Sequence, residues 1–226
     1  MNRVLIVAAH PDDEILGCGG TVARLVHEGF SAYSLILGEG VTSRDRKRQR
    51  QCRQQDINNL REEVKKANQQ IGVEETFMFD FPDNRFDTVP LLEIAKTIEE
   101  VKAKIWPEII YTHHKNDLNI DHQITYRAVL TATRPLVDEV VKQIYSFFVP
   151  SSTEWNFPQT FSPDVYVDIR STLRDKLKAM ELYQSELREF PHPRSLKGIK
   201  LSASYWGLIS GLRYAEPFKL VRMIQR

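Results

Sequence analysis

The sequence predicts an α/β fold: a Rossmann-like, doubly wound and mostly parallel sheet with helices on both faces and a small C-terminal elaboration. Residues 4–9 form a continuous apolar run rich in β-branched side chains, as expected of a central strand buried on both faces. Strand-like and helix-like segments alternate over the first two-thirds of the chain, which implies parallel strands joined by right-handed crossovers. The two most polar stretches follow the first and fourth predicted strands, where doubly wound sheets bind ligands.

Periodicity, together with start and stop signals, places the elements of the N-terminal half. After the first strand come a polar turn, a glycine-rich stretch at 17–20 and a helix over 21–29 that ends at Gly29. A second strand at 31–37 precedes a long polar helix, or two helices, over 44–72, with one apolar stripe. Apolar spacing then predicts a strand, a helix and a strand at 75–81, 90–104 and 109–112.

The C-terminal half continues the pattern less regularly. A helix over 121–133 ends before Pro135. Further strands are predicted at 143–149, 164–168 and 219–224, and helices near 173–184 and 195–212. A length of 226 residues suits a single domain spanning 1–226, large enough to hold its core without a disulfide or a structural metal.

Composition narrows the class of protein. The chain is 42% hydrophobic and 27% charged with a net charge of +1, which argues against a dedicated nucleic-acid binder. Its two cysteines form no CxxC pair, the N-terminal run lacks the pattern of a signal peptide, and no apolar stretch approaches the about 18 residues of a membrane span. We therefore expect a cytoplasmic protein with no membrane span and no nucleic-acid partner. The basic run at 44–53 is interpreted as a solvated helix face, with a phosphorylated or nucleotide-linked sugar as an alternative ligand.

A metal site is predicted where HPDDE, residues 10–14, directly follows the first strand. A single aspartate there would be explained by capping of the next helix. Histidine and carboxylates together favour a metal, because catalytic zinc sites use three protein ligands and a water. His10 and Asp13 supply two ligands. The third is expected from another strand end, and the fourth strand is followed by His113, His114 and His122.

With HPDDE after the first strand and the Asp121-His122 pair after the fourth, the chain resembles the PIG-L/LmbE-like zinc-dependent de-N-acetylases. The stretches 152–155, 183–195 and 215–218 resemble one subgroup, so the similarity covers nearly the whole chain. The resemblance implies that the acetyl group is removed from an N-acetylglucosamine-like sugar conjugate. It implies zinc bound by three ligands, with a neighbouring carboxylate as general base; Fe²⁺ or cobalt would fit the same ligands. These residues are His10, Asp13 and His122 for the metal and Asp12 for the base.

One position departs from the family pattern. Many relatives carry a histidine three residues before the DH histidine, where it would stabilise the oxyanion, and Asn119 stands there in this chain. His192 or His113 becomes the candidate for that role. His192, in the rigid loop 191–194, is favoured as a catalytic residue, and a plain surface loop histidine is the alternative.

Four residues are expected to bind substrate: Arg61, His113, Asn119 and Arg194. Arg61 lies in a stretch that resembles a family helix with a substrate-binding arginine, and a solvated arginine is its alternative. Adjacent strand residues point to opposite faces, so at most one of His113 and His114 faces the site easily. Asn119 and Asp117 are alternatives for orienting His122, as is Asp121.

Two other functions are alternatives to that of a deacetylase. A different metallohydrolase, such as a phosphoesterase, often holds two metals and would need more ligands than three. A non-catalytic sugar or nucleotide binder is the other alternative, although the carboxylate of Asp12 argues against it. The expected partner is a small-molecule amino-sugar conjugate, and the resemblance implies a homo-oligomer, since relatives are often trimers or hexamers.

Overall fold

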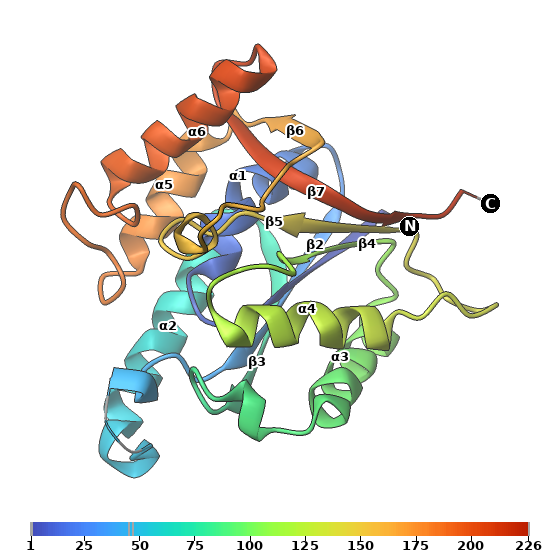
Figure 1. Cartoon of the computed structure of the whole chain (residues 1–226), viewed down its shortest axis with the longest axis vertical. Coiled ribbons are helices and arrows are strands. Elements are labelled where there is room, and N and C mark those ends of the chain that lie inside the picture. Colours follow the sequence, from blue (N-terminus) through green and yellow to red (C-terminus); the bar gives the residue numbers. More distant parts are fainter. Residues whose placement is uncertain (1, 45, 47, 226) are drawn as a thin grey trace.

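The computed structural model of the chain describes residues 2–44, 46 and 48–225, and its centre is a seven-stranded sheet (Figure 1). The strand order is β3-β2-β1-β4-β5-β7-β6; the first five are parallel, and β7 runs antiparallel to both β5 and β6. The strands are β1 (Arg3–Ala8), β2 (Ser31–Gly38), β3 (Val73–Phe81), β4 (Ile109–His113), β5 (Gln143–Phe147), β6 (Val165–Asp168) and β7 (Ala215–Met223).

Six α-helices cover the two faces of the sheet (Figure 1). One apolar core joins α1, α2, α5 and α6 to the sheet, and a second joins α3 and α4 to its other face. The helices are α1 (Asp13–His27), α2 (Gln54–Gln70), α3 (Leu91–Ile105), α4 (Ile120–Ala132), α5 (Leu173–Leu182) and α6 (Leu196–Ser210). The predicted doubly wound fold with an elaborated C-terminus is confirmed, because β6 and β7 extend the parallel sheet with antiparallel strands.

Strand β1 lies in the interior of the sheet and is buried on both faces. Val4 and Ile6 belong to the core beneath α1 and α2, whereas Leu5 and Val7 belong to the core beneath α3 and α4; all four are fully buried. In the sheet, β2 and β3 lie on one side of β1, and β4 and β5 lie on its other side. The carboxyl ends of β1 and β4 therefore flank the switch point of the sheet, where such folds form a ligand crevice.

The start of α1 differs from the prediction. The glycine-rich stretch 17–20 lies inside α1, which begins at Asp13, so the predicted helix start at residue 21 was wrong. These glycines serve close packing inside the helix: a Cβ on Gly17 would clash with the ring of Phe147 on β5. Glycine thus lets the first helix approach the sheet beside the crevice.

The predicted helix over 44–72 is also shorter in the structure. It begins at Gln54, after a 3-10 turn at Arg50–Arg53, and positions 45 and 47 lie outside the described residues. Near this turn, the guanidinium groups of three arginines form ion pairs with two carboxylates. Arg48 lies 2.7 Å from Glu39, and both Arg50 and Arg61 lie 2.6 Å from Asp80.

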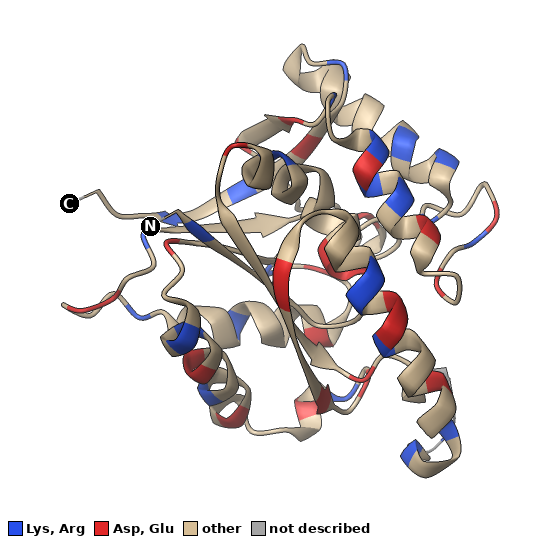
Figure 2. Ribbon diagram, turned by 180° about the vertical axis from the view of Figure 1, so that it is seen from behind, with Lys and Arg blue, Asp and Glu red and all other residues tan. Residues whose placement is uncertain are grey.

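Charges of both signs are interspersed along the helices (Figure 2). The ion pairs on Glu39 and Asp80 partly neutralise the described part of the basic run, which weakens the case for phosphate binding there. Among the described residues, no helix combines the length and the apolar character that crossing a membrane requires.

The packing of α1 predicts that one glycine-to-alanine substitution lowers the stability of the protein, although this substitution inside a helix normally raises it. Gly to Ala inside a helix normally stabilises by about 0.5–1 kcal/mol, but Gly17→Ala should destabilise by about 1–3 kcal/mol because the new methyl group overlaps Phe147. Urea unfolding measures the difference. Phe147→Leu in the Gly17→Ala background should recover part of the loss, and a Gly17→Ala variant more stable than wild type would contradict this packing.

Candidate metal centre

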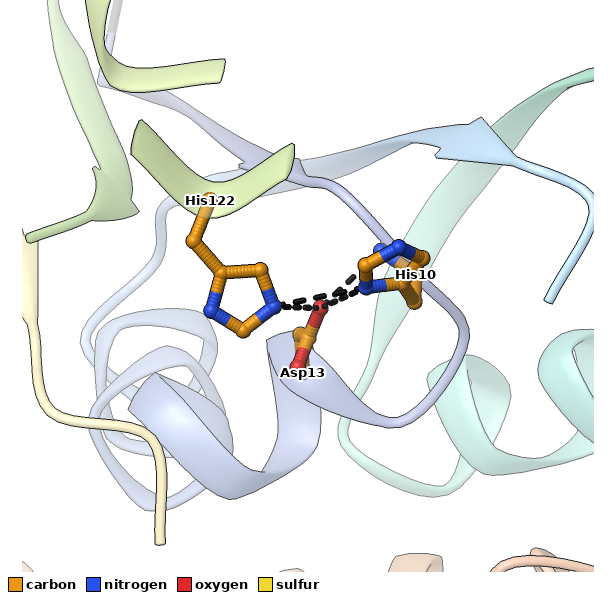
Figure 3. A group of neighbouring side chains, drawn as sticks. All are labelled: His10, Asp13 and His122. Carbon is orange, nitrogen blue, oxygen red and sulfur yellow. Dashed lines mark hydrogen bonds and ion pairs between the residues drawn. The ribbon is translucent and has the colours of Figure 1, made fainter. Parts of the chain in front are cut away.

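Three side chains from two sides of the switch point converge on one position (Figure 3). His10 follows β1, Asp13 is the first residue of α1, and His122 lies in the first turn of α4. His10 Nδ1 lies 3.3 Å from His122 Nε2, and Asp13 Oδ2 lies 3.4 Å from the first nitrogen and 3.2 Å from the second. Ligand atoms about 2.0–2.2 Å from a tetrahedral zinc ion stand about 3.3–3.5 Å apart, so the three atoms fit such an ion.

A carboxylate lies behind the His10 ring. The other ring nitrogen, Nε2, lies 2.9 Å from Asp121 Oδ2, and the second oxygen of Asp121 accepts the backbone N–H of Phe86 at 2.9 Å. Asp83 Oδ1 lies 3.4 Å from the same nitrogen of His10. A carboxylate in this position fixes the tautomer and orientation of a metal-binding imidazole.

A second carboxylate lies behind His122 in the same way. Asp117 Oδ1 lies 3.0 Å from His122 Nδ1. The Asp117 carboxylate also accepts the hydroxyls of Ser152 and Thr153 and the backbone N–H of Asn119. Burial raises the pKa of Asp117, but His122 and these hydrogen bonds outweigh it and bring the pKa down to about 2. Asp117 is therefore ionised behind His122, whereas Asp121 orients His10.

The buried negative charge of this cluster favours the binding of a cation. Four carboxylates around the two imidazoles are at most 3% exposed: Asp13, Asp83, Asp117 and Asp121. Within the described part of the chain, their ion pairs are with histidines and not with lysine or arginine. Burial lowers the pKa of His122, yet Asp13 and Asp117 raise it overall to about 9. Buried negative charge of this density is stabilised by a bound cation, so a divalent metal fits the site.

The two histidines at the end of β4 have other surroundings. His113 is fully buried, its ring stacks on His122 at 3.8 Å, and its Nε2 accepts the backbone N–H of Ala9 at 2.8 Å. Burial holds its pKa well below the ordinary value, which is consistent with a neutral ring. The placement does not fit the expected substrate contact of His113, because the ring lies beneath His122. His114, with Nδ1 3.4 Å from Ser146 Oγ, packs edge-on against Phe161.

Asp12 lies beside the metal ligands in a left-handed backbone conformation, with φ of 89°. Its carboxylate is 1% exposed, and Arg194 Nη1 donates to Oδ2 at 3.0 Å. Burial raises the pKa of Asp12 well above its ordinary value, and Arg194 opposes that rise. Arg194 also donates from Nε to Ser151 Oγ at 2.8 Å and lies 3.5 Å from Glu186.

A polar cavity of about 190 Å³ opens beside these groups. Of the residues predicted to contact substrate, Asn119 and Arg194 line it. The side chain of Asn119 caps α4 by accepting the Asp121 N–H and donates to Asn84 at 2.8 Å. A larger cavity, of about 480 Å³, lies near the amino ends of β1 and β4 and includes Arg3 and Trp106, away from the metal ligands.

Among the residues predicted to act on or bind substrate, His192 and Arg61, like His113, are not among those that line the 190 Å³ cavity. His192 Nδ1 accepts the backbone N–H of Arg194 at 3.1 Å, and its ring meets the edge of Trp155. Arg61 is bound to Asp80. The loop 191–194 therefore brings its arginine to the site rather than its histidine.

Several cavity residues were missed by sequence reasoning: Asp83, Glu186, Arg188, Ser151 and Ser152. Asp83 was within reach, since it follows β3 at the same edge of the sheet where ligands gather. Ser151 and Ser152 likewise follow the parallel strand β5 at this edge. Glu186 and Arg188 come after β6 and α5, and local patterns do not specify how this part of the chain returns to the switch point.

Known proteins resemble this chain over most of its length. The family model PIG-L: GlcNAc-PI de-N-acetylase matches residues 5–133, more than half of the chain. The chain is 27% identical over 188 residues to the uncharacterised deacetylase YaiS of Escherichia coli, with 80% of this chain and 90% of that protein covered. It is 26% identical over 230 residues to diacetylchitobiose deacetylase of Thermococcus kodakarensis, with 98% and 84% covered.

A solved structure shares the fold. The N,N'-diacetylchitobiose deacetylase of Pyrococcus horikoshii matches with a TM-score of 0.78 at 18% identity, covering 98% of this chain and 84% of that chain.

The carboxylate behind His122 predicts a measurable effect on metal binding. Asp117→Asn should weaken zinc affinity about 10–100-fold, because the amide no longer fixes the ring as a carboxylate does. Competition with a chromogenic chelator measures the affinity. Asp56→Asn, an exposed aspartate on α2, is the matched control. Equal affinities for all three proteins would show that Asp117 does not support the metal.

Proposed function

The chain belongs to the PIG-L family of GlcNAc-PI de-N-acetylases, and from this premise we propose that it is a zinc-dependent hydrolase acting on an N-acetylglucosamine-like sugar conjugate. The observation that carries the proposal is the convergence of His10, Asp13 and His122, whose facing atoms lie 3.2–3.4 Å apart beside a buried aspartate. Two imidazoles and one carboxylate are a ligand set that suits zinc. When bound there, the metal would supply Lewis acidity that polarises the amide carbonyl and acidifies water.

Asp12 is the general base of this proposal. It is the residue before the ligand Asp13, and it lies in the wall of the cavity rather than among the ligand atoms. Arg194 holds one carboxylate oxygen, Oδ2, which leaves the other to accept a proton from the attacking water. The same carboxyl group then returns the proton to the departing amine, so that acetate and a free amino sugar form.

Arg194 is the donor we assign to the substrate. Its Nε and Nη1 groups are engaged by Ser151, Asp12 and Glu186, and its remaining N–H groups are available to a carbonyl or hydroxyl oxygen. The guanidinium stays charged at every working pH. The sequence favoured His192 as the residue that stabilises the oxyanion. We do not assign it this role, because its ring packs against Trp155 and accepts the backbone N–H of Arg194.

The lining of the cavity supports a sugar as the ligand. Amide, hydroxyl and guanidinium groups surround it, and these donate to and accept from sugar hydroxyls. They come from Asn84, Asn119, Ser43, Ser151, Ser152 and Arg188. Relatives named for deacetylation of diacetylchitobiose and of N-acetyl-α-D-glucosaminyl L-malate support an N-acetylated glucosamine unit.

A two-metal phosphoesterase is less well supported. A second group of candidate ligands, His10, Asp83 and Asp121, shares His10 with the first through its other ring nitrogen. A neutral imidazole offers a lone pair on one nitrogen only, so it serves one metal at a time. The arrangement therefore favours a single metal per chain.

Acetate release tests the proposal. Zinc-loaded protein should release acetate from at least one member of a panel of N-acetylglucosamine conjugates, and Asp12→Asn should reduce kcat about 100-fold or more because the base is lost. Exposed Asp138→Asn is the control and should match wild type. Dipicolinate should abolish activity, and added zinc should restore it.

The outcomes separate the alternatives. No acetate from any conjugate, despite one bound zinc per chain, would favour a sugar-binding protein without this activity. Full activity in Asp12→Asn would show that another group is the base.

A further inference from the structure

In the first turn of α1, the buried side chain of Glu14 accepts a hydrogen bond from the buried hydroxyl of Tyr183. We propose that this pair positions Asp12, holding its backbone in the left-handed conformation that directs the carboxylate to the site. The inference rests on the proposed function, because it assigns to Tyr183 and Glu14 a role that acts through the base. Neither residue is among those that line the catalytic cavity, so both are positioning residues and not catalytic ones.

The backbone of Asp12 is under strain that its own side chain does not relieve. A residue other than glycine with φ of 89° lies about 1–3 kcal/mol above the common conformations. The Asp12 carbonyl starts the helix by accepting the N–H groups of Ile15 and Leu16, but its carboxylate makes no capping bond. The carboxylate is turned away to Arg194 instead. Surrounding groups must therefore hold this conformation.

Glu14 supplies an anchor two residues along. Its side chain is fully buried, and its Oε1 accepts the hydroxyl of Tyr183 and the amide Nδ2 of Asn68, the latter at 3.0 Å. Tyr183 is also fully buried, at the end of α5. Burial and Glu14 raise the pKa of the Tyr183 phenol. The Tyr183 hydroxyl thus fixes Glu14, the residue after the proposed metal ligand Asp13, and with it the first turn of α1, which begins directly after Asp12.

Further hydrogen bonds connect Glu14, through Asn68, to other parts of the fold. Asn68 on α2 accepts the Ser34 hydroxyl of β2 at 2.6 Å and donates to the Val64 carbonyl at 3.0 Å. The pair is thereby connected to strand β2 of the sheet and to α2 and the end of α5, which pack on one face of the sheet.

The absence of a cationic partner sets Glu14 apart from Glu216, another buried glutamate. Glu216 pairs with Lys176, whereas Glu14 has only neutral hydrogen-bond partners among the described residues, and its Oε2 has none. A buried carboxyl without a cation is unfavourable for stability, and an apolar side chain would fill the space at less cost. A role in shaping the site explains why a hydrogen-bond acceptor rather than an apolar side chain stands there.

Tyr183→Phe tests the inference while keeping the ring that packs in the core. We expect kcat for acetate release to fall about 10–100-fold, with KM within about twofold of wild type and one zinc per chain retained. Glu14→Gln keeps the accepting oxygen and should retain most activity, whereas Glu14→Leu should resemble Tyr183→Phe. Tyr145→Phe, whose hydroxyl bonds to Gln143 on β5, is the matched control.

A double-mutant cycle with Asp12→Asn distinguishes positioning from a general structural effect. If Tyr183 acts through Asp12, adding Tyr183→Phe to Asp12→Asn should change the residual kcat less than about threefold. An equal loss in both backgrounds, or no loss in either, overturns the role of the pair and leaves the proposed base intact. Full activity of Asp12→Asn alone overturns the proposed function itself, and the role of the pair with it.

Discussion

Buried negative charge at the switch point of the sheet is the constraint on which the rest of the site depends. Two imidazoles and four buried carboxylates meet there, and the described residues provide no lysine or arginine partner for those carboxylates. Positive charge must compensate such a cluster in a low-dielectric interior. The proposed metal, held by His10, Asp13 and His122, would supply that charge, and Asp117 and Asp121 would hold the two rings toward it.

Residues of the C-terminal half complete the site that forms at the edge of the parallel sheet. The turn at 151–153 binds Arg194 through Ser151 and Asp117 through Ser152 and Thr153, so it connects the proposed base to the proposed metal ligand His122. Arg194 holds the carboxylate of Asp12, and Tyr183 holds the side chain of Glu14 in the same first turn of α1. The proposed base and metal ligands thus belong to one network of polar contacts, in which each group has little freedom to turn.

The sequence was informative where local pattern and topology coincide. Alternating strands and helices predicted the fold, and HPDDE after a buried strand predicted two of the three residues that the structure brings together. The third, His122, was selected among three histidines by the family resemblance that the DH pair carries. The sequence was less informative where tertiary packing decides. The predicted helix began after the glycines of α1, because their packing partner, Phe147, is distant in the sequence. In the loop 191–194, only the tertiary path shows that Arg194 rather than His192 reaches Asp12.

The most direct test of the account is X-ray absorption at the zinc edge on protein loaded with one equivalent of zinc, compared with His122→Ala. We expect a four-coordinate ion with two imidazole ligands and two oxygens at about 2.0–2.1 Å, and the loss of one imidazole in the variant. Zinc with sulfur ligands, or a spectrum unchanged in His122→Ala, would contradict the assignment of His10, Asp13 and His122 as the metal centre.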